Sequence, residues 1–492
     1  MTTRHILYIL YGLAFIVYCT VALMSYGFDD EFFNILIIEK HGLSAFFITQ
    51  TMDVHPPLSY IINAVLYRAF GNWEVVRLFS ALTLCTSFIY LCEHIKTKGE
   101  EREAILTFIL LTSSPALLLW GTSLRWYAYF LPILIWLLVI PKKQGWPMWI
   151  KLGVGLVALA YTGYLAFVLA PALILFYWLS SSQPFEVKLK QLSVIIGVAA
   201  LVYSPQLLTF LNVHFPNRVS QTGSLFLSFA GFFIAQFSNQ GVFPLSIAAL
   251  VSTTGTLIIL YVTLRSQPIQ KLSTNPKCMS YVLFSILIIA SGVAAKFRNL
   301  VIATPLQLIW FASVKPNRTL KKFFYIGIIF IIAGNFWGSV NVYRHQDTTK
   351  NSWNLPVKEV PSIIKKEYQA CNKDAIIFTH DPTLSYHMQH LSIPSTGVYS
   401  KGINPNIKET YQCVFVIKTF VGSVSQGRYE KMLDEVENLK YSEKSVIPLQ
   451  QDFFYDYKVK LDNRYPRYAI TILKFTDVQN ANLLLSWLPT KI

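Results

Sequence analysis

Long apolar stretches recur through about the first 340 residues, and the polar positions between them are few. A helix of about 20 apolar residues is long enough to cross the hydrocarbon core of a bilayer. The pattern therefore predicts a polytopic α-helical membrane domain with about 11 spans. We place these spans at residues 6–25, 73–95, 104–122, 127–140, 148–164, 165–181, 191–211, 242–264, 279–295, 299–314 and 323–341.

Two other apolar stretches are predicted to be external juxtamembrane helices rather than spans. Residues 57–70 begin with two prolines, are short, and contain Asn63 and Arg68. Counting this segment or residues 224–240 as a crossing would put basic loops on both sides of the membrane, whereas Lys and Arg tend to stay inside. Both segments are therefore expected at the outer surface, the second as a surface or re-entrant helix.

The basic residues orient the spans. Arg4 precedes the first span and predicts that the N-terminus lies inside. Further Lys and Arg lie between alternate spans, at Lys96, Lys98, Arg102, Lys142, Lys143, Lys188, Lys190, Arg265, Lys271, Lys277, Lys315, Arg318, Lys321 and Lys322. With these loops inside, the segment after the first span and the C-terminal tail lie outside. In a bacterium this corresponds to a multi-pass protein of the inner membrane with a periplasmic tail.

After Tyr343 the apolar runs become short and the charge rises. The pattern predicts strands at residues 374–380, 413–420 and 467–475, and helices at 357–370 and 428–440. Strands that alternate with helices are typical of an α/β domain, here of about 140 residues. We therefore predict a membrane domain over residues 1–342 and a small extracytoplasmic α/β domain over residues 343–492.

The composition argues against a soluble enzyme and against a partner made of nucleic acid. Hydrophobic residues make up 53% of the chain and charged residues only 14%, whereas soluble proteins carry about 25% charged residues. The net charge of +16 comes from the short loops and the tail, as the positive-inside rule predicts. Two of the six cysteines, Cys371 and Cys413, lie in the tail and can form a disulfide if the tail is exported.

Three acids, Asp29, Asp30 and Glu31, directly follow the first span. Acids at the end of a span are costly, so they need a reason. A carboxylate at this place suits general-base activation of an acceptor hydroxyl. Asp30 and Glu31 can also hold a divalent cation, Mg²⁺ or Mn²⁺, through oxygen ligands. The simpler alternative is that the acids only cap a helix that starts at Phe32, because acids favour helix N-termini.

Three cations, Arg125, Lys296 and Arg298, are predicted on the same outer face as the acids. Arg and Lys form charge-assisted hydrogen bonds with phosphate oxygens and stabilise the charge of a phosphate that leaves. Together, the acids and cations indicate transfer of a sugar from a polyprenyl phosphate. Each cation alone is also typical of an anchor for lipid head groups.

Five motifs in this order resemble the GT-C fold glycosyltransferases of family 39, a group that includes protein O-mannosyltransferases and the lipid A aminoarabinose and rhizobial galacturonosyl transferases. The motifs are DDE (29–31), HPPLSY (55–60), FGNWEVVRLFSAL (70–82), LRWYAYF (124–130) and KFRNLVIATP (296–305). The resemblance covers roughly residues 5–340. It implies that Asp30 or Asp29 is the catalytic base and that Glu31 completes the acidic pair. It also implies that the donor phosphate is bound by His55, Arg125, Lys296 and Arg298.

The sequence thus predicts an integral-membrane, inverting glycosyltransferase. Its donor is a polyprenyl-phosphate sugar, and its acceptor is lipid A or lipopolysaccharide, another glycan, or a protein. The alternative is a transporter or flippase of a lipid-linked glycan, which needs polar residues near the middle of the membrane. Charged residues are nearly absent from the middle of the predicted spans. A non-catalytic scaffold that has kept the fold is a third possibility.

Overall fold

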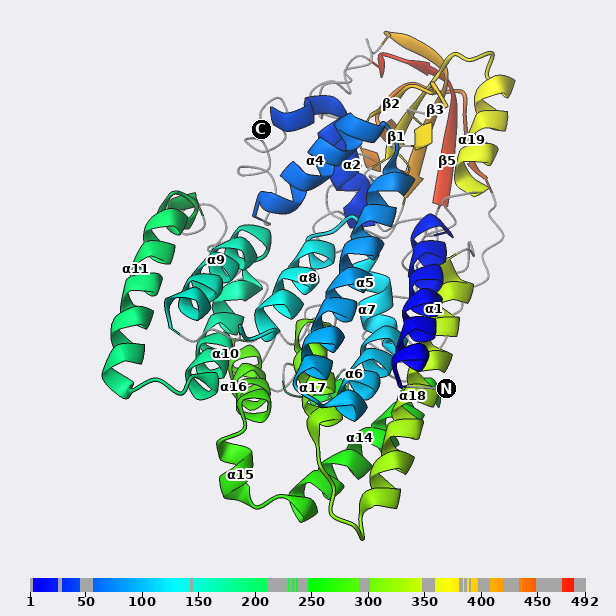
Figure 1. Cartoon of the computed structure of the whole chain (residues 1–492). Coiled ribbons are helices and arrows are strands. Elements are labelled where there is room, and N and C mark those ends of the chain that lie inside the picture. Colours follow the sequence, from blue (N-terminus) through cyan, green and yellow to red (C-terminus); the bar gives the residue numbers. More distant parts are fainter. Residues whose placement is uncertain are drawn as a thin grey trace. The chain divides into compact units, whose positions relative to one another are not determined.

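The computed structural model separates into two compact units (Figure 1). One unit comprises Met1–Met24 and Leu43–Tyr343, and the other comprises Ser25–Gly42 and Arg344–Ile492. The structure describes residues 3–24, 29–44, 56–141, 145–209, 229, 232–233, 236–237, 247–291, 301–346, 359–379, 384, 387–388, 391–396, 408–418, 433–434, 436–447 and 471–481. The first unit is helical, and the second is built around a β-sheet.

The helices of the first unit include one at every predicted span, together with one at the predicted surface helix 57–70 and one further short helix. They are α1 (Thr3–Met24), α4 (Leu58–Phe70), α5 (Trp73–Thr97), α6 (Glu101–Ser113), α7 (Pro115–Gly121), α8 (Tyr127–Leu138), α9 (Trp146–Thr162), α10 (Leu165–Ser180), α11 (Phe185–Thr209), α14 (Ile247–Ser266), α15 (Ile269–Ser273), α16 (Pro276–Ala290), α17 (Ala303–Ser313) and α18 (Lys321–Gln346). Each predicted span overlaps one of these helices, except that the span at 104–122 is divided between α6 and α7. Residues 224–240, predicted to form a surface helix, lie mostly outside the described residues.

Within the described residues, four helices are long and apolar enough to cross a membrane: His5–Leu23, Trp73–Thr97, Ile247–Ser266 and Lys321–Val340. The pair α6 and α7 adds a fifth candidate, bent by 64°. Several shorter apolar helices, among them α8, α10 and α16, accompany them. The predicted class of polytopic helical membrane protein is therefore confirmed, whereas the count of crossings stays a prediction.

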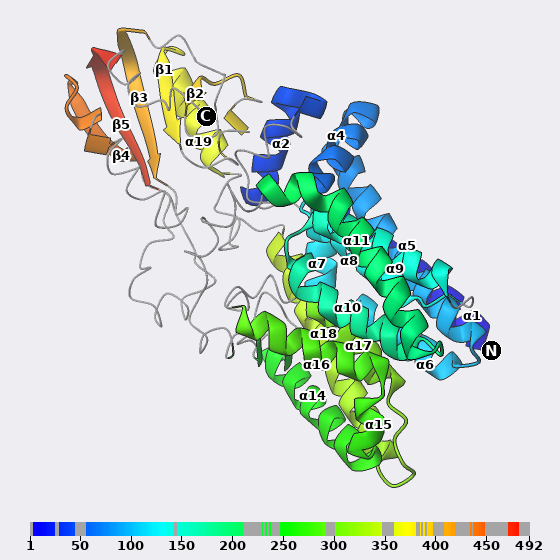
Figure 2. The same cartoon turned by 90° about the vertical axis from the view of Figure 1, so that its left-hand side faces the viewer.

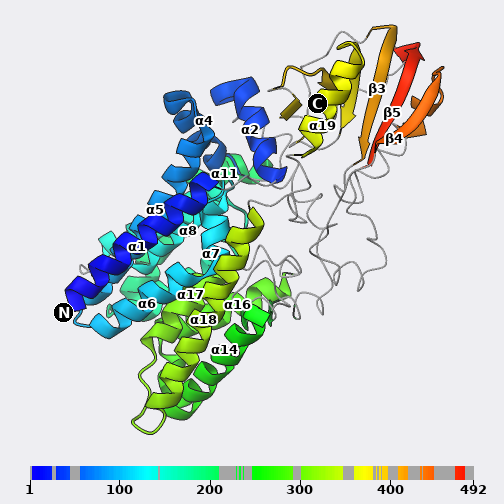
Figure 3. The same cartoon turned by 90° about the vertical axis from the view of Figure 1, so that its right-hand side faces the viewer.

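The core of the first unit lies where α5 and α8 pack together. The buried face of α5 includes Val76, Leu84 and Phe88, none of which is exposed, and this helix also packs against α1 and α6 (Figure 3). Ten of the twelve side chains of α8 are buried. Because α8 is enclosed on nearly every side, it fixes the position of the turn that precedes it.

Small residues and polar bonds join α14 to α18. A Cβ atom added at Gly255 would lie 2.5 Å from the carbonyl oxygen of Gly327, so the two backbones approach closely. Next to this contact, the Ser252 hydroxyl donates to the side-chain oxygen of Asn335 at 3.2 Å. Contacts of this kind associate helices in lipid, where the hydrophobic effect between helices is weak. On the other side of the unit, α11 packs along α9 (Figure 2).

The second unit contains a sheet with strand order β2-β1-β3-β5-β4. Its strands are β1 (Ala375–Thr379), β2 (Ser395–Thr396), β3 (Thr410–Lys418), β4 (Glu443–Ile447) and β5 (Thr471–Gln479). β1 pairs in parallel with β2 and β3, whereas β5 is antiparallel to β3 and β4. With α19 (Glu359–Ala370), this is the small α/β region that the sequence predicted. Of the predicted helix at 428–440, the structure describes residues 433–434 and 436–440, and 433, 434, 436 and 437 are helical.

Apolar side chains cover both faces of this sheet. Ile377 and Phe415 belong to one buried cluster, and Ile376 and Val414 belong to another. Alternation of this kind is expected because successive side chains of a strand point to opposite faces. The second unit therefore has a two-sided hydrophobic core of its own.

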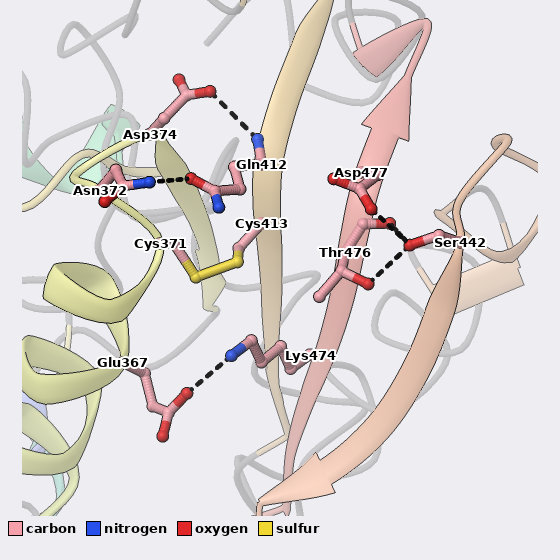
Figure 4. Close-up of a disulfide and its surroundings, with 10 residues drawn as sticks. All are labelled: Glu367, Cys371, Asn372, Asp374, Gln412, Cys413, Ser442, Lys474, Thr476 and Asp477. Atoms are coloured by element: carbon pink, nitrogen blue, oxygen red, sulfur yellow. Dashed lines mark hydrogen bonds and ion pairs between the residues drawn. A yellow bond between two sulfur atoms is a disulfide. The ribbon is translucent and has the colours of Figure 1, made fainter.

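A disulfide joins Cys371, which follows α19, to Cys413 in β3, as the sequence suggested (Figure 4). Both cysteines are buried. An ion pair of 2.9 Å between Lys474 and Glu367 also connects the sheet to α19 (Figure 4). These links hold α19 against the sheet.

The segment after α1 belongs to the second unit in space. It carries α2 (Asp29–His41), in which Ile35 and Ile38 are buried. The predicted division at residues 342 and 343 keeps this segment with the membrane domain, whereas the structure groups Ser25–Gly42 with Arg344–Ile492. The three acids of the predicted catalytic site lie on this segment.

Candidate active site

Arg125 lies in the turn between α7 and α8, and only 5% of it is exposed. The turn satisfies much of its own polar backbone. The Ser123 hydroxyl donates to the Trp120 carbonyl at 2.8 Å and accepts from the Arg125 backbone N–H at 3.3 Å. The Thr122 hydroxyl donates to the Leu118 carbonyl at 2.9 Å. Arg125 is therefore presented from a short, internally bonded turn rather than from an open loop.

A buried polar network of side chains from neighbouring helices holds this turn in place. The Asn63 amide of α4 donates to the carbonyl of Leu124 at 2.9 Å. The Tyr129 hydroxyl of α8 donates to the side-chain oxygen of Asn63 at 2.5 Å, and Ser80 of α5 lies 3.5 Å from the same hydroxyl. Asn63 and Ser80 are completely buried. Side chains from three helices thus form one network, and its Asn63 holds the carbonyl of the residue directly before Arg125.

Aromatic side chains pack around Trp126, which directly follows Arg125. The rings of Trp126 and Tyr127 stack with their centroids 3.9 Å apart, and Phe130 meets Trp126 edge-on at 5.3 Å. A Cβ atom added at Gly163 would lie 2.5 Å from the Trp126 ring. The glycine therefore provides the space that this ring occupies.

The fixed turn and the guanidinium group together determine which ligands Arg125 can bind. A guanidinium has five N–H donors in a rigid fork and stays charged at any physiological pH. Because the surrounding side chains hold the turn, little freedom is left to be lost when an anion binds. The geometry suits recognition of an oxyanion such as phosphate.

The acids lie on α2, which begins at Asp29. Glu31 is completely buried, and the side chains of Asp29 and Asp30 are outside the described part of the structure. Glu31 therefore differs from an acid on a solvated surface. Because α2 belongs to the second unit and Arg125 to the first, the meeting of acids and cations in one site stays a prediction.

Three other predicted site residues, His55, Lys296 and Arg298, lie outside the described residues, and their proposed contacts with a phosphate stay predictions. Within the described residues, no group of three or more His, Cys, Asp or Glu side chains is placed to hold a metal ion. The proposed Mg²⁺ or Mn²⁺ at Asp30 and Glu31 likewise stays a prediction.

Sequence reasoning did not find the Asn63–Tyr129 network. A signal was present, because Asn63 is a polar residue inside a short apolar helix. In the sequence, Asn63 supported only the prediction that residues 57–70 do not cross the membrane. Its partners at Leu124 and Tyr129 lie 61 and 66 residues away, so no local pattern connects them.

Comparison with protein-family models and with curated proteins gave no match. Comparison with solved structures matched the crystal structure of ArnT from Cupriavidus metallidurans bound to undecaprenyl phosphate. The match has a TM-score of 0.54 and 11% identity, and it covers 96% of this chain and 98% of ArnT. The chain has the fold of ArnT. The same protein in its apo state gives a TM-score of 0.52 at 12% identity and the same coverage.

The likeness to ArnT confirms the GT-C fold that the sequence motifs indicated. It extends beyond the helical unit, because the aligned length includes 96% of this chain. The C-terminal α/β region is therefore part of the shared architecture. The resemblance in sequence was limited to roughly residues 5–340, so the structure enlarges it.

Proposed function

We propose that this protein is an inverting glycosyltransferase of the membrane that takes its sugar from a polyprenyl-phosphate donor. The observation that carries the proposal is the likeness in fold, over nearly the whole chain, to ArnT bound to undecaprenyl phosphate. The buried Arg125 adds a residue of the right chemistry for a phosphate. The acceptor is a component of the cell envelope: lipid A or lipopolysaccharide, another glycan, or a protein.

The proposed reaction is a single displacement at the anomeric carbon. A carboxylate, Asp30 or Asp29, removes the proton from the acceptor hydroxyl, whose oxygen forms the new bond to the anomeric carbon. The bond between that carbon and the phosphate oxygen breaks, and the electron pair leaves with the polyprenyl phosphate. Attack from the face opposite the leaving group inverts the configuration.

The cations act on the leaving group in this scheme. Arg125, together with His55, Lys296 and Arg298, stabilises the negative charge that develops on the phosphate oxygens. Glu31 completes the acidic pair with Asp30. If a divalent cation takes part, oxygen ligands from Asp30 and Glu31 suit Mg²⁺ or Mn²⁺.

The reaction is proposed to take place on the periplasmic side of a bacterial inner membrane. The Cys371–Cys413 disulfide supports export of the second unit, because disulfides persist in oxidising compartments and are rare in the cytosol. The basic loops support the same orientation by the positive-inside rule.

The test is a comparison of envelope glycans by mass spectrometry in a deletion strain and in strains complemented with variants. Deletion is expected to remove one sugar, and the wild-type chain to restore it. Asp30→Asn is expected to restore less than about 1% of it, since general-base catalysis contributes about 10²–10⁴-fold. Glu39→Gln, which neutralises another acid of α2, is the matched control and is expected to restore the sugar.

Asp29→Asn and the double variant Asp29→Asn/Asp30→Asn decide which carboxylate is the base. Membrane fractions checked by immunoblot show whether each variant is inserted at the wild-type level. Normal transfer by the inserted double variant would contradict the proposal. A flippase would instead leave the unmodified lipid-linked sugar on the cytoplasmic side in the deletion strain.

A further inference from the structure

The first unit contains a cavity of about 900 Å³ at the end of the helical bundle that lies away from Arg125. It is lined where α5, α8, α10 and α17 end and where α6 and α16 begin. α8 starts directly after the Arg125 turn, and Leu138 and Ile140 at its other end line the cavity. The cavity is therefore separate from the Arg125 site, and it lies at the end that the basic loops predict to be inside.

The deep part of the cavity is apolar. Its lining includes Leu91, Leu138, Ile140, Phe176, Leu306 and Ile309, and all six side chains are buried. Four different helices and the segment after α8 contribute them. This surface suits hydrocarbon better than the hydrated body of a sugar or a nucleotide.

Four lysines and two glutamates line the cavity as well: Lys98, Lys271, Lys277, Lys315, Glu100 and Glu103. Lys277 forms an ion pair with Glu103, and Lys315 forms one of 3.1 Å with Glu100. Four positive charges against two negative ones leave an excess of two. Within the part of the chain that the structure describes, the ammonium groups of Lys98 and Lys271 make neither an ion pair nor a hydrogen bond.

Lys98 lies in a setting that favours an anion. Partial burial lowers the pKa of its ammonium group, and the positive charge of Lys277 lowers it further, whereas the negative charges of Glu103 and Glu100 act in the opposite direction without cancelling the shift. A desolvated cation near another cation is stabilised when a negative charge binds between them. Hydroxyl and amide groups of Ser266, Thr274 and Asn275 line the same region.

We infer that this cavity binds an anionic phospholipid, with the phosphate at Lys98 and Lys271 and the acyl chains against the apolar side chains. The place favours a lipid over a soluble phosphate, since anionic head groups gather where spans end at the cytoplasmic leaflet. The inference concerns a second ligand site and is independent of the transfer reaction. Its failure and the failure of the proposed function are therefore distinguishable.

The test is native mass spectrometry of the full-length protein, purified in detergent and titrated with phosphatidylglycerol, phosphatidylcholine or inorganic phosphate. Lys98→Gln/Lys271→Gln removes the two positive charges. The matched control, Lys321→Gln/Lys322→Gln, removes two exposed charges at the start of α18, outside the cavity. Thermal unfolding of each lipid-free variant checks that it is folded.

The wild-type protein is expected to bind phosphatidylglycerol saturably and more tightly than phosphatidylcholine. The cavity variant is expected to bind it about 30-fold more weakly, from the contribution of two basic residues near an anionic lipid. The control is expected to stay within about twofold of wild type. Equal weakening by both variants, equal affinity for the two lipids, or unchanged affinity in the cavity variant would each overturn the inference. Displacement of the lipid by millimolar inorganic phosphate would assign the site to a soluble phosphate instead.

Discussion

The interactions that stabilise the helical unit differ from those that stabilise the second unit. In the helical unit the links between helices are non-covalent: the close approach at Gly255, the Ser252–Asn335 bond, and the buried network at Asn63. In the second unit a disulfide and an ion pair fasten α19 to a sheet that is apolar on both faces. The contrast follows the surroundings of each unit.

Helices surrounded by lipid gain little from burying apolar side chains against one another, because lipid tails are also apolar. Close backbone packing and internal hydrogen bonds must then decide which helices meet. A domain in water is stabilised by burying its apolar core, but the total stabilising free energy is small for a domain of this size. A covalent link that restricts its unfolded chain is therefore an effective addition.

The largest expected effect is the loss of the covalent link. Cys371→Ser/Cys413→Ser is expected to destabilise the second unit by about 4 kcal/mol, since the cysteines are 42 residues apart. Amide hydrogen exchange of the full-length protein measures this loss. The variant is expected to exchange faster in β1 and β3 and at the wild-type rate in α14 and α18. Cys19→Ser, which removes a free thiol from α1, is the control. Unchanged protection of β1 and β3 would show that the apolar core alone holds the unit.

The next effect concerns close packing in the helical unit. Gly255→Ala places a methyl group against the Gly327 carbonyl, and overpacking of this kind destabilises by about 1–3 kcal/mol. Gly197→Ala in α11 is a matched control, because nothing lies within 4 Å of the added atom. The first variant is expected to lower the Tm of the purified protein, and the second to leave it unchanged or raise it, because Ala favours helix over Gly. Equal Tm values for the two variants would show that the close approach of α14 and α18 does not contribute to stability.

The third comparison concerns the network at Asn63, which includes the smallest expected change in stability and has a consequence for activity. Asn63→Leu keeps the size of the side chain but leaves the Leu124 carbonyl without its donor, which costs about 1–3 kcal/mol. Tyr129→Phe removes the bond to Asn63 and the weak one from Ser80, keeps the Asn63–Leu124 bond, and is expected to cost about 1 kcal/mol. If the network positions Arg125, Asn63→Leu raises the KM for the polyprenyl-phosphate donor more than Tyr129→Phe does. An unchanged KM in both variants would reduce the network to a purely structural role.

The positions of the helices could be predicted from the sequence because apolar length is a local property. The break between α6 and α7 was missed, although Ser114 and Pro115 carried a signal for it. Proline has no backbone N–H and favours the first turn of a helix, and Ser114 caps α7 by accepting from Leu117 N–H at 3.4 Å. The segment predicted as one span over 104–122 is therefore bent by 64° at this point, and its crossing of the membrane stays a prediction.

The candidate site was predictable only in part. Arg125 is buried, its role stays a prediction, and nothing local revealed that Asn63 and Tyr129 hold its turn. The acids were expected in a loop or at the start of a helix at Phe32, whereas α2 begins at Asp29. The strand order of the second unit depends on pairing between distant segments, which periodicity does not encode.

Trp126 constrains the evolution of Gly163. Since any side chain at position 163 would collide with the indole ring, the glycine cannot be replaced freely while Trp126 stays the same. Homologues that keep a large ring at the position of Trp126 are expected to keep glycine at the position of Gly163. Where the ring has been replaced by a smaller side chain, the glycine is free to vary, and the two alignment columns should change together.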